Sequence, residues 1–385
     1  MTRPRVLMVS PTGVMGGSES IFVNLIERAS IGGYEPSVLL LRDGPLRAAL
    51  EPTGVPMTLA AIGRFRDLPA TATTMRGIAA VIHRERPDVV YSNMAMAHMY
   101  AALPAWFADR PALWHQGGIP APASMLDRCA SALPARCVLT VSSQAARAQR
   151  RLRPGPPVAL FRPGIALDRF EAADGAKIRA THGVPPHAPF VGIVGRLQEW
   201  KGQQEFLLAA AEVAKVMPEA HFAVVGGAIL GWEGDYPDRL RRLASELRIE
   251  DRVIFTGHTD DVPDWLHALD IVVNASAAEP FGLVVAEAMA TGAVVVAVRS
   301  GGPADVITDS VNGLLCDAPE PRQIAERILV AARDRELRTR IATAARAHAQ
   351  ACFAADRMAS DFGNILRRCL LSPNGGRRAR EEADR

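Results

Sequence analysis

Short apolar runs alternate with helix-like segments along the whole chain, and this alternation limits the folds open to it. The runs are Val6–Val9, Ser37–Leu41, Asp88–Tyr91, Ala112–Trp114 and Val138–Val141, then Phe190–Val194, His221–Val225, Val253–Thr256, Ile271–Val273 and Val294–Val298. Strands that alternate with helices form parallel sheets covered by helices on both faces. Two such series in 385 residues predict an α/β protein with two doubly wound domains rather than one barrel. Ligands are then expected in a cleft where the carboxyl ends of the two sets of strands face each other.

The stretch 162–189 is rich in Pro and Gly and is the expected connection between the domains. The first domain then covers residues 1–163 and the second covers residues 164–353. A further helix-like segment spans residues 354–371. The charged end, residues 372–385, has the composition of a disordered tail.

Composition excludes several classes of protein. The apolar run near the start, Val6–Val9, is too short for a signal peptide, and no run reaches the roughly 20 residues of a membrane span. The five Cys residues show no CxxC spacing, so disulfides and zinc are not expected and a reducing cytoplasm fits. No His, Cys or carboxylate spacing is typical of a metal site. We therefore predict neither a metal nor another cofactor.

Charge is unevenly distributed. Residues 1–163 hold 18 Arg against 10 Asp and Glu, a net charge of +8, whereas the remainder carries −5. The cluster Arg147–Arg153 is either a solvated helix end or part of a surface for an anionic partner. Few aromatic residues lie among these charges, which argues against nucleic acid. The apolar segment Met94–Tyr100, which we expect to be a loop, either packs in the core or offers an adaptable surface to a lipid-linked acceptor. In the second case the protein would contact the inner face of a membrane through its basic domain.

The most informative motif lies between the runs Ile271–Val273 and Val294–Val298. It is expected to be a loop followed by a short helix that begins near Gly282 and ends at Gly292. Glu287 is the one polar residue between Leu283 and Ala290, and a carboxylate in an apolar helix is costly unless a partner hydrogen-bonds to it. Glu279 precedes the helix N-terminus, whose free N–H groups attract anions. The motif predicts a ligand with both hydroxyl and phosphate groups.

A second loop, Gly195–Gly202, follows the first strand of the second half. Arg196 and Lys201 are five residues apart in it and can neutralise a diphosphate. Lys201 is one of only three Lys residues in a chain with 41 Arg. That choice of Lys is either chance or an adaptation to the ligand.

Three weaker signals also follow strands. Gly16 and Gly17 either approach a phosphate or sugar, or only form a tight turn. His115 either contacts a sugar hydroxyl or is structural. Gly227 and His258 are candidates for contact with a nucleobase. No dinucleotide, P-loop or hydrolase-elbow spacing is present, which disfavours an NAD oxidoreductase.

Taken together, Gly16-Gly17, His115, the Arg196–Lys201 loop and Glu279-x7-Glu287 resemble glycosyltransferase family 4, whose members are retaining enzymes of the GT-B fold. The resemblance covers roughly residues 5 to 370, and the motifs occur in the family's order. It implies two Rossmann-like domains, a nucleotide-sugar donor held mainly by the second, and a C-terminal helix that crosses back to the first. The chain departs from the family at Pro163-Gly164-Ile165-Ala166 and at Asp305, which leaves the linker and some donor contacts open.

The resemblance also implies roles for residues. Glu287 would hold the donor's ribose and Glu279 its sugar, while Arg196 and Lys201 would hold the diphosphate with the N–H groups of Gly282, Leu283 and Val284. Gly17 would lie against the phosphate and the transferred sugar, and His115 would contact the sugar from the acceptor side. The remaining residues assigned to donor binding are Gly16, Gly195, Gly227, His258 and Phe281.

The predicted activity is transfer of a sugar from a nucleoside diphosphate sugar to a hydroxyl acceptor with retention of configuration. No side chain is a convincing covalent nucleophile, so front-face attack is what the family implies. A sugar-nucleotide epimerase or a phosphorylase on the same fold is the alternative. The nucleobase, the sugar and the acceptor do not follow from the sequence.

Overall fold

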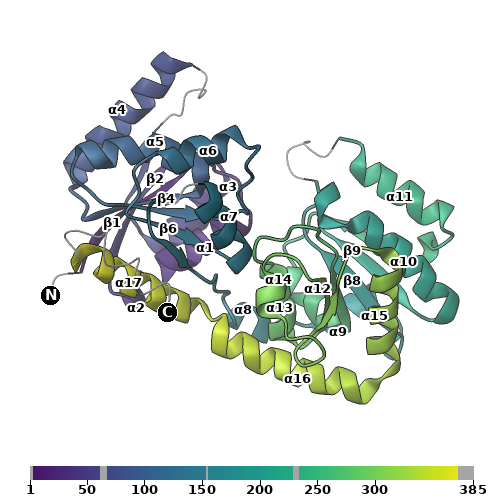
Figure 1. Ribbon diagram of the computed structural model, residues 1–385. Helices are drawn as coiled ribbons and strands as arrows, with labels where there is room; N and C mark the ends of the chain where they lie inside the picture. Colours follow the sequence, from purple (N-terminus) through teal and green to yellow (C-terminus); the bar gives the residue numbers. More distant parts are fainter. Residues whose placement is uncertain (1–2, 61–66, 153–154, 229–233, 372–385) are drawn as a thin grey trace. The chain divides into compact units, whose positions relative to one another are not determined.

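The computed structural model describes residues 3–60, 67–152, 155–228 and 234–371. The chain divides into two compact units, which are described separately (Figure 1). Unit 1 comprises residues up to Gly164 and again from Ala355 onward, and unit 2 comprises Ile165–Ala354. The predicted tail, residues 372–385, lies outside the described residues, as does Arg153 of the basic cluster.

Unit 1 contains a seven-stranded parallel sheet. Its strands are β1 (Arg5–Ser10), β2 (Glu35–Leu40), β3 (Met57–Leu59), β4 (Val89–Asn93), β5 (Ala112–Gln116), β6 (Cys137–Thr140) and β7 (Val158–Leu160). Its helices are α1 (Gly17–Glu27), α2 (Ala29–Gly32), α3 (Pro45–Leu50), α4 (Leu68–Glu85), α5 (Met94–Phe107), α6 (Met125–Ala132), α7 (Ser143–Leu152) and α17 (Ala355–Leu371). The strand order is β3-β2-β1-β4-β5-β6-β7, so the chain changes direction across the sheet between β1 and β4.

Unit 2 contains a six-stranded parallel sheet. Its strands are β8 (Phe190–Val194), β9 (His221–Val225), β10 (Val253–Gly257), β11 (Ile271–Asn274), β12 (Val294–Val298) and β13 (Leu314–Cys316). Its helices are α8 (Asp168–Glu171), α9 (Gly175–Thr181), α10 (Gln203–Val216), α11 (Tyr236–Glu246), α12 (Val262–Ala268), α13 (Leu283–Thr291), α14 (Pro303–Val306), α15 (Pro321–Arg333) and α16 (Arg335–Cys352). The strand order is β10-β9-β8-β11-β12-β13, with the corresponding change of direction between β8 and β11.

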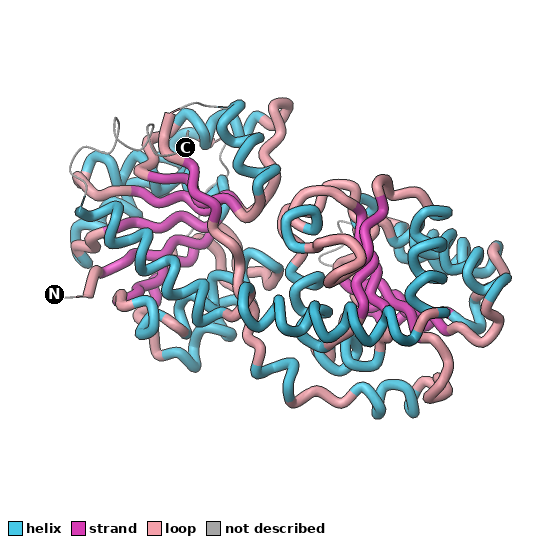
Figure 2. Tube along the Cα trace, turned by 60° about the horizontal axis from the view of Figure 1, so that its bottom comes forward, coloured by secondary structure: helices cyan, strands magenta, loops and turns pink. Residues whose placement is uncertain are grey.

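The central strands are mostly apolar, with polar residues near their carboxyl ends, because helices cover both faces of each sheet (Figure 2). Every residue of β8 and β12 is buried, and so is every residue of β1 after Arg5. The two doubly wound parallel sheets predicted from the apolar runs are confirmed. The strands β3, β7 and β13 were not predicted, because each has only three residues and lies at an edge of its sheet.

The last helix, α17, is part of the core of unit 1, where the family resemblance places it. It lies beside α2 in Figure 1. The two helices approach so closely that a Cβ atom on Gly363 would lie 1.9 Å from the carbonyl oxygen of Gly32. The ring of Phe362 packs edge-on against Tyr34 and Tyr91, with centroids 5.1 Å and 5.3 Å apart.

The passage from unit 1 to unit 2 is shorter than the predicted connection. The units divide between Gly164 and Ile165. The helices α8 and α9, which lie within the stretch 162–189, pack in unit 2, where α9 contacts α12. Pro and Gly residues therefore marked the boundary but also occur in the loops that follow it.

Candidate functional site

In unit 2 the two predicted loops lie at the carboxyl ends of β8 and β11, the adjacent strands between which the chain changes direction. Ligands of doubly wound sheets bind at such a position. Gly202 ends the first loop with a φ of 79°, and a Cβ atom there would lie 2.5 Å from the carbonyl oxygen of Ala275. Glycine at 202 therefore lets the two loops pack against each other.

Lys201 and Glu279 form an ion pair across these loops, with 2.7 Å between Nζ and Oε2. The same carboxylate oxygen accepts hydrogen bonds from Ser276 Oγ at 3.0 Å and Asn274 Nδ2 at 3.3 Å. The Lys201 ammonium also lies 4.1 Å from the centroid of the Trp200 ring. With 20% and 7% of the Lys201 and Glu279 side chains exposed, this is a nearly buried, well-satisfied pair. A phosphate that reached Lys201 would share or replace its carboxylate partner.

Glu287 lies in the apolar helix α13, partly buried and with no hydrogen-bond partner among the described residues. Burial raises its pKa to about 7, although the nearby Arg169 guanidinium acts in the opposite direction. Gly282 is the N-cap of α13 with a φ of 85°, and its carbonyl oxygen accepts from the N–H groups of Val285 and Ala286, whereas those of Leu283 and Val284 have no acceptor within the helix. The arrangement offers one carboxylate and a set of free N–H donors.

The other predicted residues of unit 2 differ in how available they are. The side chains of Arg196 and His258 are exposed, and 75% of the His258 side chain is accessible. A Cβ atom on Gly227 would lie 2.6 Å from the backbone nitrogen of His258, so those two loops touch. Phe281 is buried, and its ring packs edge-on against Phe353 at 5.7 Å. The Phe281 side chain therefore packs beneath the loop and leaves little of its own surface exposed.

In unit 1 the glycine loop and His115 lie close together. Gly16 is the N-cap of α1, which begins at Gly17. A Cβ atom on Gly117 would lie 2.6 Å from Ser18 Oγ, so the start of α1 touches the loop that follows His115. His115 itself is fully buried, and burial lowers the pKa of its imidazole to about 4. The ring is therefore neutral at physiological pH and available as a hydrogen-bonding group.

Sequence reasoning missed three polar residues at these places. Asn93 ends β4 and lies 3.2 Å from His115 through Oδ1 and Nδ1. Asn274 and Ser276 hold the Glu279 carboxylate. Each lies within three residues of the end of a buried apolar run, near the carboxyl end of its strand, and that position was the available signal. Their contacts depend on side-chain geometry that spacing does not reveal.

The segment Met94–Tyr100, expected to be a loop, is the first half of helix α5. Five of its seven side chains, Ala95 and those from Ala97 to Tyr100, are buried, so the core-packing alternative is correct and the adaptable-surface alternative is wrong. Ser142 accepts a hydrogen bond from the N–H of Ala145 at 3.3 Å. It caps α7, the helix that carries the exposed side chains of Arg147, Arg150 and Arg151.

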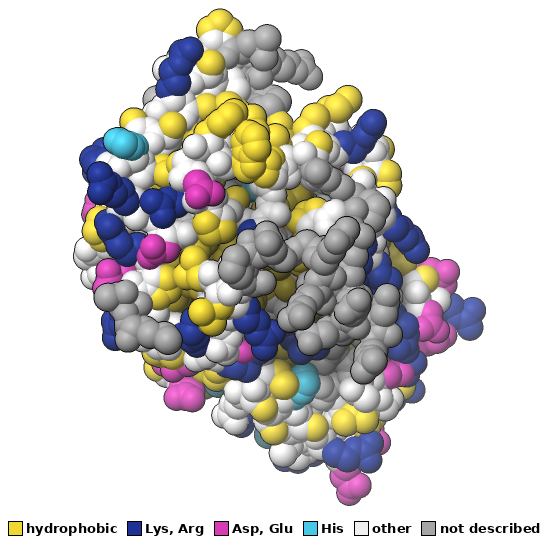
Figure 3. Space-filling view, turned by 60° about the vertical axis from the view of Figure 1, so that its left-hand side comes forward, with side chains coloured by type: hydrophobic (Ala, Val, Ile, Leu, Met, Phe, Trp, Pro, Cys, Tyr) yellow, Lys and Arg dark blue, Asp and Glu magenta, His cyan; other side chains and the backbone are white. Residues whose placement is uncertain are grey.

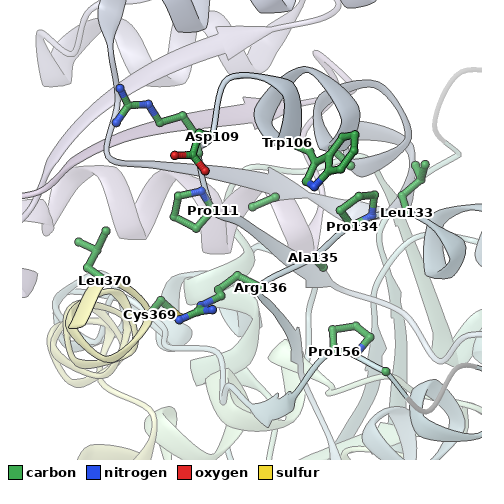
Figure 4. Close-up of a pocket in the computed structure, with 14 residues that line it drawn as sticks. Trp106, Asp109, Pro111, Leu133, Pro134, Ala135, Arg136, Pro156, Cys369 and Leu370 are labelled. Atoms are coloured by element: carbon green, nitrogen blue, oxygen red, sulfur yellow. The ribbon is translucent and has the colours of Figure 1, made fainter. Parts of the chain in front are cut away.

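A separate groove of about 650 Å³ lies at the opposite, amino-terminal edge of the unit 1 sheet. The ends of α5 and α17 border it, together with the segments that lead into β5, β6 and β7. Figure 4 shows Arg136 reaching toward the end of α17 that carries Cys369, and Trp106 lying beside Pro134.

In the described ranges no three His, Cys, Asp or Glu side chains cluster as metal ligands would. No helix there is long and apolar enough to cross a bilayer.

Two family models match the chain in sequence order. The model described as Glycosyltransferase Family 4 matches residues 15–169, and the model described as Glycosyl transferases group 1 matches residues 174–348. The two matches meet near the division between unit 1 and unit 2.

Individual proteins are similar to the chain over part or most of its length. D-inositol 3-phosphate glycosyltransferase 2 of Catenulispora acidiphila is 39% identical over 173 residues, which are 44% of this chain and 40% of that protein. The chain spans half or less of the length of the relatives of this kind that it matches. The lipopolysaccharide core biosynthesis glycosyltransferase LpsE of Rhizobium meliloti is 27% identical over 331 residues, 86% of this chain and 89% of LpsE. The crystal structure of Anabaena HepE in complex with UDP superimposes with a TM-score of 0.84 at 26% identity, over 94% of this chain and 100% of HepE.

Proposed function

We propose, from the premise that this chain belongs to the family 4 glycosyltransferases of GT-B fold, that it transfers a sugar from a nucleoside diphosphate sugar to a hydroxyl acceptor. The Lys201–Glu279 pair carries the proposal, because it presents a cation and a carboxylate together at the switch point of the unit 2 sheet. A diphosphate needs the cation, and sugar hydroxyls suit the carboxylate. The crystal structures of Anabaena HepE with UDP and with UDP-glucose support a donor of this class.

In the proposed reaction the bond between the anomeric carbon and the diphosphate oxygen breaks, and the diphosphate leaves with the electron pair. Lys201, Arg196 and the free N–H groups at the start of α13 stabilise the negative charge that develops on it. One well-placed donor of this kind contributes on the order of 3–4 kcal/mol. The acceptor hydroxyl attacks from the same face, its proton passes to the leaving phosphate, and configuration is retained. These groups supply the required positive charge, so we expect transfer without a metal.

Glu287 completes the proposed donor site. A ribose diol donates two hydroxyl hydrogen bonds, and Glu287 has no hydrogen-bond partner among the described residues, although Arg169 acts on it electrostatically. Binding would therefore relieve the cost of a partly buried carboxylate in an apolar helix. This explains why an acidic residue is placed where its own pKa is raised to about 7.

The experiment is a mass-spectrometric screen of the purified protein with a panel of nucleotide sugars, in the presence and absence of hydroxyl acceptors. The acceptors include D-inositol 3-phosphate and a lipopolysaccharide core saccharide, the compounds named for the relatives. Transfer that needs an acceptor, persists in EDTA and gives a retained anomer supports the proposal. Conversion of the donor alone would indicate an epimerase, and a requirement for inorganic phosphate would indicate a phosphorylase. Full activity of both Lys201→Ala and Arg196→Ala would refute the phosphate site.

We also infer that unit 1 contacts an anionic lipid surface through the groove of Figure 4. Trp106 and Phe107 end α5 beside this groove with 59% and 78% of their surface exposed, and Arg110 and Arg136 line it. Aromatic side chains with neighbouring guanidinium groups suit the interface of an anionic bilayer. In the face viewed in Figure 3, basic side chains border exposed hydrophobic ones. Here the membrane contact is assigned to the end of α5, whereas the sequence suggested its beginning.

Vesicle co-sedimentation tests this contact. The protein should bind phosphatidylglycerol vesicles at low salt, bind phosphatidylcholine vesicles weakly, and lose binding in Trp106→Ser/Phe107→Ser. Val216→Ser removes an exposed apolar side chain from unit 2, outside this surface, and should have no effect. Equal binding of the double variant and the parent protein would exclude this surface.

A further inference from the structure

Asn93 and His115 are paired in the register of two neighbouring strands of unit 1. They lie opposite each other at the carboxyl ends of β4 and β5, and neither has any exposed surface. Asn93 Oδ1 is 3.2 Å from His115 Nδ1. β4 is also the strand next to β1 at the switch point of the sheet, where ligands of such folds bind.

The contact replaces one that Asn93 would ordinarily make. Asn93 is the N-cap of α5, a position at which an Asn side chain usually accepts a hydrogen bond from the first turn of the helix. No such bond forms, because the side chain is directed to His115 instead. The next residue, Met94, adopts a left-handed φ of 68°, which is strained for a residue with a side chain. The missing helix cap and the strained backbone both lower the local stability of the start of α5. The Asn93–His115 contact is the interaction that forms in their place.

Two buried polar atoms of this pair have no partner among the described residues. They are His115 Nε2 and Asn93 Nδ2. The low pKa of His115, about 4, leaves its imidazole neutral, with a hydrogen on only one nitrogen. The structure turns Oδ1 of the Asn93 amide toward His115, and this oxygen accepts a hydrogen bond but cannot donate one. In this amide orientation the contact requires the hydrogen on Nδ1. Nε2 then has a free lone pair.

We propose that Asn93 is a positioning residue, which holds His115 in the tautomer with hydrogen on Nδ1 so that Nε2 accepts a hydrogen bond from a sugar hydroxyl. The sugar part of this inference rests on the proposed function, whereas the tautomer does not.

The surroundings of the imidazole favour a neutral hydroxyl over a charged group. The Tyr91 ring lies roughly parallel to it with centroids 6.1 Å apart, and the Phe161 ring meets it edge-on at 5.9 Å. The two rings do not cover the edge of the His115 imidazole at Cε1, and this edge faces Gly117. A Cβ atom placed on Gly117 would lie 4.0 Å from His115 Cε1. This edge of the imidazole is therefore covered only by Gly117, which has no side chain and whose loop touches Ser18. An unpaired buried acceptor costs free energy, and a ligand hydroxyl would remove that cost.

Histidine tautomers can be observed directly by nitrogen NMR on protein labelled with ¹⁵N-histidine. The chain has nine His residues, and the signals absent from His115→Gln identify those of His115. We expect a protonated Nδ1 and a bare Nε2 at pH 7 in the parent protein. Asn93→Asp should keep this tautomer because a carboxylate also accepts from Nδ1–H, whereas Asn93→Leu should shift it toward hydrogen on Nε2. Ser92→Ala is the matched control, since Ser92 is the neighbouring buried residue on the same strand, and it should leave the tautomer unchanged.

The proposal is overturned if the parent protein carries its hydrogen on Nε2, or if Asn93→Leu leaves the tautomer as it was while remaining folded. If that variant does not fold, the parent tautomer and Asn93→Asp decide the question. Kinetics test the second part: Asn93→Leu should lower kcat severalfold, up to the roughly tenfold expected for loss of the His115 hydrogen bond, with little change in KM for the donor. An unchanged kcat would contradict a role toward the sugar. Absence of transfer in the parent protein would instead refute the proposed function and leave the tautomer result standing.

Discussion

The two units place their candidate residues at equivalent positions of similar sheets, but the residues are neutral in unit 1 and charged in unit 2. Unit 1 carries 25 basic and 15 acidic residues, yet its polar pair at the switch point, Asn93 and His115, is neutral and buried. Unit 2 carries 19 basic and 26 acidic residues, yet its switch point presents the Lys201 ammonium, paired with Glu279. The net charge of a domain therefore does not locate an anion site. A nearly buried ion pair at the end of a strand does so better, because the field of its cation is less screened there than at the surface.

The comparison also gives the units opposite responses to pH, and the largest expected effect is on the acid side. In unit 1, burial lowers the pKa of His98 to about 3, well below its ordinary 6.5. Keeping His98 neutral in the folded protein contributes to the free energy of unfolding above pH 6.5. This contribution is lost as the pH falls toward 3, and the total loss is at most about 5 kcal/mol. His98→Phe keeps a ring stacked on Trp114, whose centroid is 4.9 Å from that of His98, and should flatten this loss. Urea denaturation at pH 7 and pH 4.5 measures it. Equal acid sensitivity in the variant would show that His98 is not the titrating group.

The charged and neutral sites should differ in their share of catalysis. Lys201→Gln removes the cation and leaves Glu279 with only Ser276 and Asn274, so kcat/KM should fall by about 10²–10³, or about 2.7–4 kcal/mol. His115→Gln removes a neutral hydrogen-bonding group and should cost about tenfold. Steady-state kinetics on the donor identified in the screen compares the two. A larger loss of kcat/KM in His115→Gln than in Lys201→Gln would contradict the greater catalytic role assigned to the charged site.

In unit 2 the pH effect has the opposite sign. The folded pKa of Glu287, about 7, is above the ordinary 4.5, so its contribution is fully present below pH 4.5 and is lost as the pH rises through 7. The loss is on the order of 3 kcal/mol. Glu287→Gln should therefore be more stable than the parent protein at pH 8, match it at pH 4.5 and lose nucleotide binding. Thermal unfolding and UDP titration measure the two properties. Glu246→Gln, on an exposed part of α11, serves as the control and should change neither.

The smallest of these effects concerns the packing of α17, which only unit 1 requires. Gly363→Ala places a Cβ atom 1.9 Å from the Gly32 carbonyl oxygen and should destabilise unit 1 by about 1–3 kcal/mol despite the better helix propensity of Ala. Gly77→Ala in α4 is the matched change, since nothing lies within 4 Å of its Cβ position. It should stabilise by about 0.5–1 kcal/mol. Chemical denaturation compares them, and equal stability of the two variants would argue against the close approach of α17 and α2.

Much of the fold could be predicted because central strands of parallel sheets are continuous apolar runs. Edge strands such as β3 and β13 were missed, since three residues give no pattern. The residues of the candidate site also divide into those that a sequence pattern reveals and those that it does not. Glu287 was found because a lone carboxylate in an apolar helix contradicts its surroundings. Asn93 was not, because its pairing with His115 arises from the register of two strands whose alignment is not visible in the sequence.

The membership of α17 in unit 1 has a consequence for biosynthesis. Unit 2 is one continuous segment, Ile165–Ala354, whereas unit 1 combines the segment before it with the segment after it. As the protein leaves the ribosome, the sheet of unit 1 emerges first but lacks Phe362, which packs on Tyr34 and Tyr91. Unit 2 can complete its core earlier, although it is made later. The unit translated first is thus the last to mature, and its apolar layer must be shielded for nearly the whole time of synthesis.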